Sequence, residues 1–508
     1  MCGLFFVVER GRPVDAPRAL LATSALRHRG PDGTGHYRFE RNYAGPNGPT
    51  PVSGFVGHTR LAILDPSALS SQPFRRGDRT LAYNGEIYNF RALRDEMTRA
   101  GTQFETEGNT EVLLALLNSQ GITALNRANG MWAFCLLDES AGLLTAARDR
   151  YGKKPLFYYA DAQTICLASE ITPIAAYLGR KPRLNADALD SYLRDGWLFP
   201  HADGRTHIEG IRQVRAGGVL SIDLAHWSLR EDLYFDLARD AAAPPARPDD
   251  LAALVQDAVL SRLVADRRVG LLLSGGVDSS LILSVLHARG LADRVTCFTG
   301  DAGKSDDARY ARMCVQQLGI QAIDVAMDYG ATSMDAFLQV CRRQEKPFPF
   351  IGNALAMPQL YAQIAQHDVP VVLDGTGGDE IFAGYWYRHY RFAVAQALGE
   401  GRQQWIADSL ASNADDAKMR ALTQQAVREA QGVREAGFRE VGIRCEADDP
   451  ADLDTFVAAS VGAAPAQDVL ENFKGTLGSA LLADAREGRL HEWLWQNDRN
   501  AMACGIEN

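Results

Sequence analysis

Short apolar or alternating runs, separated by turn residues, dominate residues 54–168. They include FVGHTRLAIL, LAYNGEIYNF, MWAFCLLD and TICLAS. Alternation with a period of two and frequent turns predict strands that pair antiparallel. One helix is expected in this region at NTEVLLALLNSQG, where Asn109 or Thr110 would cap the helix and Gly121 would end it. The pattern predicts a strand-rich N-terminal domain.

The pattern of the second half is different. LAALVQDAVLSRLV has the apolar spacing of an amphipathic helix, and VGLLLSGG and VVLDGTGGDE are each typical of a buried strand that enters a glycine-rich turn. Helices between such strands predict a parallel, doubly wound α/β sheet. The last third is rich in Ala, Gln, Arg, Asp and Glu, with leucines at helical spacing, and predicts a helical C-terminal part.

The stretch AAAPPARPDD, at residues 241–250, separates these two patterns. It lacks apolar periodicity and contains several prolines, which predicts an exposed linker. We therefore expect one domain at residues 1–240, a linker at 241–250 and a second domain at 251–508. A length of 508 residues fits at least two domains.

Composition narrows the classes of partner. A formal charge of -10 and a pI near 5.6 argue against a basic surface for nucleic acid or an anionic membrane, and favour small-molecule partners. The eight cysteines are scattered without the short spacings of zinc or redox motifs, which suits a reducing cytoplasm. The opening residues, MCGLFFVVER, have no basic leader, and their apolar run is too short for a signal or membrane helix. A lipidated Cys2 would need an apolar leader before it.

Cys2 is a candidate nucleophile because it becomes the N-terminal residue once Met1 is removed. Its thiol would then lie beside an α-amino group with a pKa of about 7.7–8.0, which can serve as a general base. Most Met-Cys starts are inert, so the interpretation depends on the blocks that follow. These are ALRHRGPDG at residues 25–33, GHTRLAILD at 57–65 and YNGEIYNF at 83–90.

In this order, the blocks resemble the class II glutamine amidotransferase domain of the asparagine synthetase family. The resemblance implies an αββα sandwich of two antiparallel sheets, of the N-terminal nucleophile type. It also implies that the Cys2 thiolate attacks the amide of glutamine, and that Asn84 and the backbone N–H of Gly85 form an oxyanion hole. The simpler alternatives are an inert Cys2 and a hairpin turn at Asn84 and Gly85.

The resemblance also assigns the groups that would bind glutamine. Arg60 would hold the substrate carboxylate and Glu86 its amino group, together with Asn84 and Gly85. The alternative for Arg60 is a surface cation. Where the family usually has an aspartate, this chain has Asn109, which accepts a hydrogen bond but carries no charge. Weaker glutamine binding, or a larger share of ammonium recognition by Glu86, would follow.

LLLSGGVDSSLILSVL predicts a phosphate-binding loop. A buried strand, a Ser-Gly-Gly turn and a helix start follow one another, so that the backbone can approach phosphate at a helix N-terminus. It is not a Walker loop, because it lacks Gly-Lys-Ser/Thr. It closely resembles the SGGxDSS loop of synthetases that cleave ATP between the α- and β-phosphates. A plain glycine-rich turn is the alternative.

This second resemblance implies ATP and Mg²⁺ as cofactors. Two strands that end in glycine-rich turns, the second at VVLDGTGGDEIFAGY, would place both turns at the carboxyl edge of the sheet, where ligands bind. Asp278 and Asp379 would bind Mg²⁺. The implied ATP contacts are Leu272, Ser274, Gly275, Gly276, Asp278, Ser279, Ser280, Gly300, Asp374 and Gly375.

Two departures from the family bear on the reaction. Asparagine synthetases usually have Ser-Gly-Glu-Gly where this chain has Thr376, which cannot act as a general base near neutral pH. Another residue would have to replace the glutamate, or the acceptor is not aspartate. The segment LWQNDRNAMACGIEN resembles a family stretch that continues into a portion with a lysine at the adenylate, and the sequence ends at Asn508 before it. We expect a synthetase domain without its usual C-terminal end; a piece of a longer protein and a divergent enzyme both stay open.

The sequence thus predicts a glutamine-dependent, AMP-forming ligase with an internal ammonia tunnel. Its substrates would be glutamine, ATP and a carboxylate, most directly aspartate, which would yield asparagine, glutamate, AMP and pyrophosphate. The alternatives are an amidotransferase for a sugar acid or secondary metabolite, and a glutaminase with a non-catalytic nucleotide-binding domain. A β-lactam-forming synthetase fits less well, because such enzymes need no glutaminase. A homodimer is left open.

Overall fold

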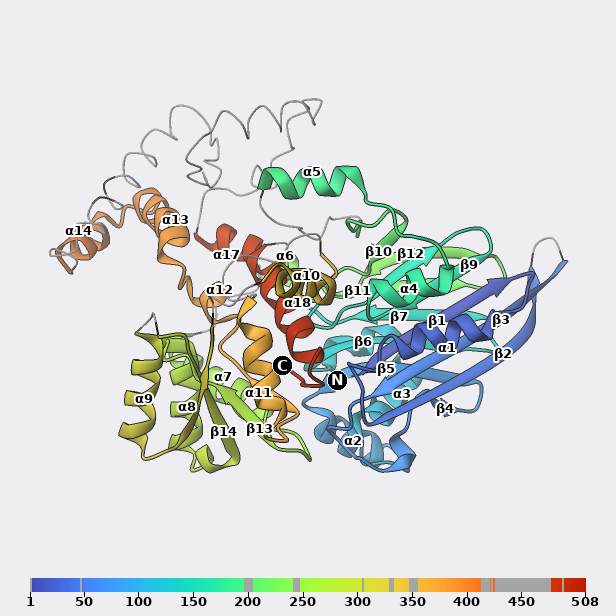
Figure 1. Cartoon of the computed structure of the whole chain (residues 1–508), viewed down its shortest axis with the longest axis horizontal. Coiled ribbons are helices and arrows are strands. Elements are labelled where there is room, and N and C mark those ends of the chain that lie inside the picture. Colours follow the sequence, from blue (N-terminus) through green and yellow to red (C-terminus); the bar gives the residue numbers. More distant parts are fainter. Residues whose placement is uncertain are drawn as a thin grey trace. The chain divides into compact units, whose positions relative to one another are not determined.

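The computed structural model describes residues 2–45, 48–195, 204–240, 247–303, 306–328, 333–346, 355–412, 421, 424, 477–486 and 488–508 (Figure 1). The chain divides into two compact units. The first comprises residues 1–184, 200–375 and 493–508, and the second comprises residues 185–199 and 376–492.

Two six-stranded antiparallel sheets form the N-terminal part of the first unit. One sheet has the order β10-β8-β9-β1-β3-β2 and the other the order β12-β11-β7-β6-β5-β4. The first contains β1 (Gly3–Arg10), β2 (Gly33–Gly45), β3 (Gly48–Arg60), β8 (Phe157–Ala160), β9 (Thr164–Ala168) and β10 (Ile211–Gln213). The second contains β4 (Phe74–Arg76), β5 (Arg79–Ile87), β6 (Gly130–Asp138), β7 (Leu143–Arg148), β11 (Gly218–Asp223) and β12 (Ser228–Leu233).

Alternation along β1 explains why the two sheets stack. Leu4, Phe6 and Val8 pack in a cluster with residues of β6 in the other sheet, whereas Phe5 and Val7 pack with α1 (Ala16–Ser24) and α4 (Ile171–Leu178). Both faces of the strand are therefore buried, and each large aliphatic side chain contributes about 1.5–3 kcal/mol. The opposite sheet packs against α2 (Phe90–Arg99) and α3 (Asn109–Gln120). The predicted αββα sandwich is confirmed.

Helix α3 ends as predicted but begins differently. Gly121 is its C-cap with a φ of 64°, a conformation that glycine adopts readily. The N-cap is Gly108, so the prediction that Asn109 or Thr110 caps the helix was wrong. Asn109 is the first helical residue, and its side chain donates a hydrogen bond to Glu86. The Asn109 amide, which the local pattern assigned to capping, is therefore bonded to Glu86 on another element.

A parallel sheet of four strands, in the order β15-β14-β13-β16, follows in the same unit (Figure 1). Successive strands add to one side of β13 until β16 adds to the other side. The two strands at this reversal are neighbours, so the turns after them border the crevice where open α/β sheets bind ligands. The doubly wound prediction is confirmed. The elements are α7 (Pro248–Ser261), β13 (Val269–Leu272), α8 (Val277–Ala288), β14 (Val295–Asp301), α9 (Asp307–Leu318), β15 (Ala322–Ala326), α10 (Met334–Gln344), α11 (Met357–Ala365) and β16 (Val371–Leu373).

Part of the predicted linker is helical. Helix α7 begins at Pro248, within residues 241–250, because a proline suits the first position of a helix and acidic residues follow in the first turn. The remaining linker residues 241–246 lie outside the described part of the chain.

The described residues of the second unit are mainly helical, as predicted from the last third of the sequence. They include α5 (Ala186–Asp195), α12 (Gly378–Phe382), α13 (Trp386–Gly399), α14 (Gln403–Ser412) and α17 (Leu477–Arg486). Within this unit, His389 Nε2 lies 2.8 Å from Asp484 Oδ2, and both side chains are buried. This pair joins α13 to α17.

The last described segment belongs to the first unit from Trp493 onward. It begins within α18 (Arg489–Met502) and ends beside β16, where Glu507 forms a parallel bridge with Val371. The backbone N–H of Val372 donates to the carbonyl of Glu507, and the N–H of Glu507 donates to Pro370, each at 2.7 Å. These bonds fix the segment along the edge of the parallel sheet.

Among the helices of the described ranges, none is long and apolar enough to cross a membrane. The cysteines within those ranges are free, and Cys445 lies outside them.

Helix α18 buries amides that lack partners. Gln496 Nε2 and Oε1, and Asn500 Nδ2, have no hydrogen-bond partner, although Gln496 is only 1% exposed. An unpaired buried polar group costs about 1–3 kcal/mol. We expect Gln496→Met, which keeps the length of the side chain, to increase the free energy of unfolding by about 1 kcal/mol, measured by thermal and urea denaturation.

Gln344 provides a matched control, because its amide donates to Asn500 Oδ1 at 2.9 Å. Gln344→Met should lower the free energy of unfolding. Equal destabilisation by both substitutions would show that the Gln496 amide is satisfied in solution.

Candidate active site

Cys2 lies at the start of β1, at the ends of the two stacked sheets. It is 8% exposed, and its backbone nitrogen donates to Asn84 Oδ1 at 3.0 Å. Its Sγ lies 4.0 Å from the carbonyl oxygen of Leu61. The thiol is therefore held between β5, which carries Asn84, and the loop that follows β3.

Asn84 and Gly85 lie within β5 and are paired with β6, so the alternative of a hairpin turn was wrong. With its oxygen occupied by Cys2, Asn84 has a buried Nδ2 without a partner. At Gly85, an added Cβ would lie 2.1 Å from the carbonyl oxygen of Met131. A glycine is required for this approach of the two strands. A residue with an unused donor is thus bonded to the backbone nitrogen of Cys2.

Arg60 ends β3 and is partly buried rather than free on the surface. Its guanidinium donates to the carbonyl oxygen of Ser67 at 2.8 Å and to that of Asp65. Asp65 has a φ of 45°, and Ser70 donates to its side chain at 2.5 Å. A constrained loop therefore fixes the direction of the cation.

Glu86 and Asn109 are in direct contact, because Asn109 Nδ2 donates to Glu86 Oε2. Burial, followed by the nearby Glu507 charge, raises the pKa of Glu86 to about 8. Asn109 thus supports Glu86 without supplying charge. Near neutral pH, this carboxyl group is largely protonated when no cation lies beside it.

Burial raises the pKa of the Cys2 thiol, against the opposing charges of the amino terminus and Arg60. The thiol therefore needs a base to become a nucleophile at neutral pH.

The Ser-Gly-Gly turn joins β13 to α8 as predicted. Ser274 and Ser279 have their Oγ atoms 3.0 Å apart, and Gly276 is the N-cap of α8. At Gly275, which has a φ of 84°, an added Cβ would lie 2.3 Å from the carbonyl oxygen of Asp307. Ser280 is in the first turn, where its N–H donates to Gly276 O at 3.1 Å. This turn presents hydroxyls and a helix N-terminus to an anion.

The turn after β16 approaches the same helix start. A Cβ at Gly375 would lie 2.8 Å from Asp278 Cβ, so the two turns meet closely. Asp374 Oδ2 accepts hydrogen bonds from Asn497 Nδ2 at 3.0 Å and from Asn508 Nδ2 at 2.8 Å. The structure therefore brings Asp278, Asp374 and Gly375 together at the carboxyl edge of the sheet.

The positions of Leu272 and Gly300 are less directly related to the candidate nucleotide site. Leu272 is buried in a cluster with Phe298 and Val325, as core residues are. Gly300 lies within β14, which continues to Asp301, and not just past the strand. An added Cβ at Gly300 would lie 2.5 Å from Met327 Cε.

Asp278 lies in the first turn of α8, and Asp379 in the first turn of α12. Across the part of the chain that the structure describes, no three His, Cys, Asp or Glu side chains form a metal-binding group. Magnesium is commonly held by one or two carboxylates together with phosphate oxygens. Asp278 therefore fits Mg²⁺ only in combination with a bound phosphate, and the joint binding of Mg²⁺ by Asp278 and Asp379 stays a prediction.

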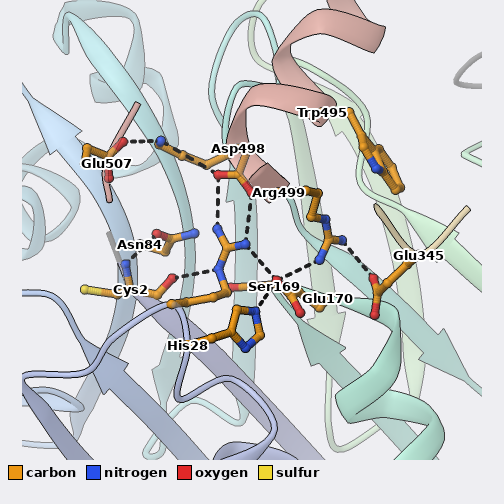
Figure 2. A network of polar contacts seen from close by, with 12 residues as sticks. Cys2, His28, Asn84, Ser169, Glu170, Glu345, Trp495, Asp498, Arg499 and Glu507 are labelled. Atoms are coloured by element: carbon orange, nitrogen blue, oxygen red, sulfur yellow. Dashed lines mark hydrogen bonds and ion pairs between the residues drawn. The ribbon is translucent and has the colours of Figure 1, made fainter. Parts of the chain in front are cut away.

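Sequence reasoning missed the charged network next to Cys2, shown in Figure 2. Arg29 is fully buried and donates from Nε to the carbonyl oxygen of Cys2 at 3.3 Å. Its terminal nitrogens form two bonds with Asp498, at 2.9 and 3.1 Å, and one with Glu170 at 2.8 Å. Arg29 and Asp498 both lie in quoted motif blocks, but nothing local pairs residues 469 positions apart. Lys154 and Glu507 form a further buried pair.

The raised pKa of Glu86 predicts a pH dependence of stability. The folded chain keeps the Glu86 proton up to about pH 8, whereas the group ordinarily titrates near 4.5. Between these values the folded state binds more protons, so the contribution of Glu86 to stability falls as pH rises. We expect Glu86→Gln to flatten the decline of unfolding free energy between about pH 5 and 8.

Glu111→Gln is the control of opposite sign. Burial acts to raise the pKa of Glu111, but hydrogen bonds from Thr106, Glu105 and Arg76 outweigh it and lower the pKa. This substitution should destabilise near pH 7, with an effect that diminishes in acid. Parallel pH profiles for wild type and Glu86→Gln would contradict the assignment to Glu86.

Comparison with known proteins follows the two halves of the chain. Residues 1–234 match the glutamine amidotransferase domain family, and residues 250–508 match the asparagine synthase family. A Methanocaldococcus jannaschii protein, provisionally named asparagine synthetase (glutamine-hydrolyzing) 2, is 30% identical over 76% of this chain and 76% of its own length. Asparagine synthetase (glutamine-hydrolyzing) 3 of Bacillus subtilis is 34% identical over 45% of this chain and 38% of its length.

A Mycobacterium tuberculosis protein, also provisionally named asparagine synthetase, is 32% identical over 76% of this chain but only 60% of its own length. The chain thus spans less than two thirds of that relative. Two solved chains, an allosteric enzyme of purine biosynthesis and a B. subtilis glutamine phosphoribosylpyrophosphate amidotransferase, align with TM-scores of 0.33 at 15% and 16% identity, too low to compare the folds. They cover 64% and 73% of this chain. On the domain matches and the M. jannaschii relative, the chain belongs to the asparagine synthase family and carries a glutamine amidotransferase domain.

Proposed function

We propose that this protein hydrolyses glutamine at Cys2 and transfers the ammonia to a carboxylate activated by ATP. The observation that carries the proposal is the contact between the Cys2 nitrogen and Asn84 Oδ1 at 3.0 Å, which leaves the buried Asn84 Nδ2 without a partner. The residue that carries the nucleophile is thus bonded to a residue with an unused donor, and acyl transfer requires both groups.

Removal of Met1 would turn the Cys2 nitrogen into an amine, held by the Asn84 oxygen. This amine would take the thiol proton as Sγ attacks the glutamine amide carbon. Asn84 Nδ2 and the Gly85 N–H would stabilise the oxyanion. The amine would return the proton to the leaving nitrogen, which releases ammonia and leaves a thioester that water hydrolyses to glutamate.

Glutamine recognition would use the groups around this centre. Arg60, already oriented by Ser67 and Asp65, would bind the substrate carboxylate. Glu86 would bind the ammonium group and lose its proton as it does so, because an adjacent cation lowers a carboxyl pKa. Asn109 would orient Glu86.

The second half of the reaction would occur at the turns after β13 and β16. The acceptor carboxylate would attack the α-phosphorus of ATP, so that pyrophosphate leaves into the turn formed by Ser274, Gly275 and Gly276, with Ser279 and Ser280. Asp374 and Gly375 would lie against the adenosine. Ammonia would then attack the acyl carbon and AMP would leave.

Mg²⁺, held by Asp278 and Asp379 together with phosphate oxygens, would offset the negative charge of the departing pyrophosphate. The chain's own contribution is to fix these carboxylates at helix starts.

Aspartate is the first candidate acceptor, with asparagine as its product. Its support is the family and the names of the relatives. A second candidate function is the transfer of ammonia to another carboxylate, such as that of a sugar acid or a secondary metabolite. Thr376 favours it, as do relatives from Penicillium rubens and Gibberella zeae that are named amidases and are each 30% identical. A glutaminase with a non-catalytic nucleotide domain is the third candidate.

Cys2→Ala tests the first half of the proposal. We expect it to abolish glutamine-dependent AMP formation, because no sulfur remains to form the thioester, while ammonium chloride still serves as nitrogen donor. AMP, pyrophosphate and glutamate are measured with each donor. Cys135→Ala is the control, because Cys135 is buried in the core between the sheets. Continued use of glutamine by Cys2→Ala would falsify the assignment of the nucleophile.

The identity of the acceptor is tested with ATP, glutamine and one carboxylate at a time. Aspartate-dependent release of AMP and pyrophosphate, with asparagine as product, is expected if the first candidate holds. AMP only with another acid supports the second candidate. Glutamate without AMP under every condition supports the third. Asp278→Asn should lower AMP formation in the active combination about 100-fold or more, as loss of a key electrostatic group does, without a matching loss of glutaminase.

A further inference from the structure

Two adjacent lysines in the loop between β7 and β8 contact the end of the chain through partners of different charge. Lys154 Nζ pairs with the carboxylate of Glu507, and both side chains are almost fully buried. Lys153 Nζ instead donates to the amide oxygen Oδ1 of Asn508 at 2.9 Å. Lys153 forms no ion pair with the residues that the structure describes. One lysine is therefore neutralised by the fold, and the other is not.

The loop that carries these lysines is fixed by Asp149. Its carboxylate accepts hydrogen bonds from the backbone N–H groups of three residues of the loop. These are Tyr151 at 3.1 Å, Lys153 at 3.0 Å and Lys154 at 2.9 Å. Gly152 has a φ of 65°, a conformation that glycine adopts readily. The starting point of the Lys153 side chain is therefore set by its own domain.

Asn508 places Lys153 beside the turn after β16. The Asn508 side chain is 7% exposed, and its Nδ2 donates to Asp374 Oδ2 at 2.8 Å and to the Tyr361 hydroxyl at 2.9 Å. With Nδ2 held by these two acceptors, Oδ1 is directed at Lys153. A single amide thus separates a lysine of the amidotransferase domain from Asp374, the proposed adenosine contact.

The neutral partner of Lys153 leaves its protonation state free to change. A carboxylate partner favours the charged form of a lysine, whereas an amide oxygen accepts a hydrogen bond from the ammonium and from the neutral amine alike. When Lys153 is neutral and donates to Asn508, its lone pair points away from that oxygen. Asn508 therefore orients the amine without fixing its charge.

The surroundings favour the neutral form. Burial lowers the pKa of Lys153 from its ordinary value of 10.5, and the charge of Lys154 acts in the same direction. The charges of Asp374, Glu507 and Asp498 act to raise this pKa, but burial outweighs them. The side chain is only partly buried, so it can return a proton to water.

Formation of an amide from an activated carboxylate needs such a proton acceptor. When ammonia attacks the acyl carbon, the new nitrogen carries three hydrogens and a positive charge, and one proton has to leave. Thr376, the second residue after Asp374 in the sequence, cannot accept it near neutral pH. Carboxylates ordinarily titrate near pH 4, at about 4, and match this proton poorly. An amine with a lowered pKa is a better match.

We propose that Lys153 is the general base of amide formation and takes a proton from the ammonia nitrogen as that nitrogen attacks the acyl adenylate. The C–N bond forms, the bond from the acyl carbon to the phosphate oxygen breaks, and its electron pair leaves with AMP. The Lys153 ammonium then releases its proton to water. Asn508 is a positioning residue that directs the amine. This inference rests on the proposed transfer of ammonia to a carboxylate activated by ATP.

Lys153→Arg tests the proposal, because arginine keeps the positive charge but cannot accept a proton. Two rates are compared, with Mg·ATP and aspartate or whichever carboxylate supports AMP release. Exchange of labelled pyrophosphate into ATP reports adenylation without ammonia and should stay close to wild type. Amide formation from ammonium chloride should fall about 100-fold or more, as loss of a general base does.

The pH profile separates a base from a merely structural lysine. At constant free ammonia, the wild-type rate of amide formation should fall as pH drops through the Lys153 pKa, because protonated Lys153 cannot act. This dependence should be absent from the residual rate of Lys153→Arg.

A second measurement needs neither a variant nor a known acceptor. The rate at which acetic anhydride modifies Lys153 in the intact chain, followed by mass spectrometry across pH, gives its titration directly. The midpoint should lie below the ordinary lysine value of 10.5.

Lys181→Arg is the matched control, because Lys181 is an exposed lysine of the same domain. This variant should leave both rates unchanged.

Three results would overturn the role of Lys153 alone. They are wild-type amide formation by Lys153→Arg, equal loss of pyrophosphate exchange and amide formation in that variant, which would make Lys153 a binding residue, and an unshifted titration of Lys153. A wild-type chain that shows no pyrophosphate exchange with any carboxylate would instead contradict the proposed function, and the inference with it.

Discussion

The fully buried guanidinium of Arg29 is the constraint on which the arrangement around Cys2 depends. Burial alone would favour the neutral form, yet Asp498 and Glu170 hold the pKa of Arg29 above its usual value. Removal of one partner of such a buried pair costs about 3–5 kcal/mol, because a charge is left uncompensated. The start of β1 and the end of α18 are therefore held by one cation, although they lie at opposite ends of the sequence.

The same charges position elements beyond the nucleophile. Arg499 binds Glu170 at 2.7 Å and Glu345 at 2.8 Å, and Glu345 accepts hydrogen bonds from the first N–H groups of α4, at Ile171 and Thr172. A carboxylate at a helix N-terminus is favourable. Alternating charges thus connect α18, α10 and α4 in a single network (Figure 2).

Local sequence patterns predicted the sheets, the two glycine-rich turns and their place at the strand ends, because each depends on residues a few positions apart. They did not predict contacts between residues that are far apart in the sequence. Asn109 has the chemistry of a cap, yet Glu86 binds its amide. Arg29 and Asp498 have no periodicity that relates them, and only the folded chain brings them together. Tertiary pairing of single polar residues has no short-range signature, so the charged network could not be predicted.

The groups bonded to Cys2 differ on its two sides: Arg29 has its partners, whereas Asn84 has a buried donor without one. On the α18 side of Cys2, Arg29 and Asp498 have their partners within the protein. On the β5 side, Asn84 Nδ2 has no partner and Glu86 retains a proton near neutral pH. Both conditions cost stability unless a ligand supplies an acceptor and a cation. Glutamine has a carbonyl oxygen, which can accept a hydrogen bond from Asn84 Nδ2, and an ammonium group, which can supply the cation beside Glu86. The side of Cys2 that the fold leaves incomplete is therefore the side that the substrate would complete.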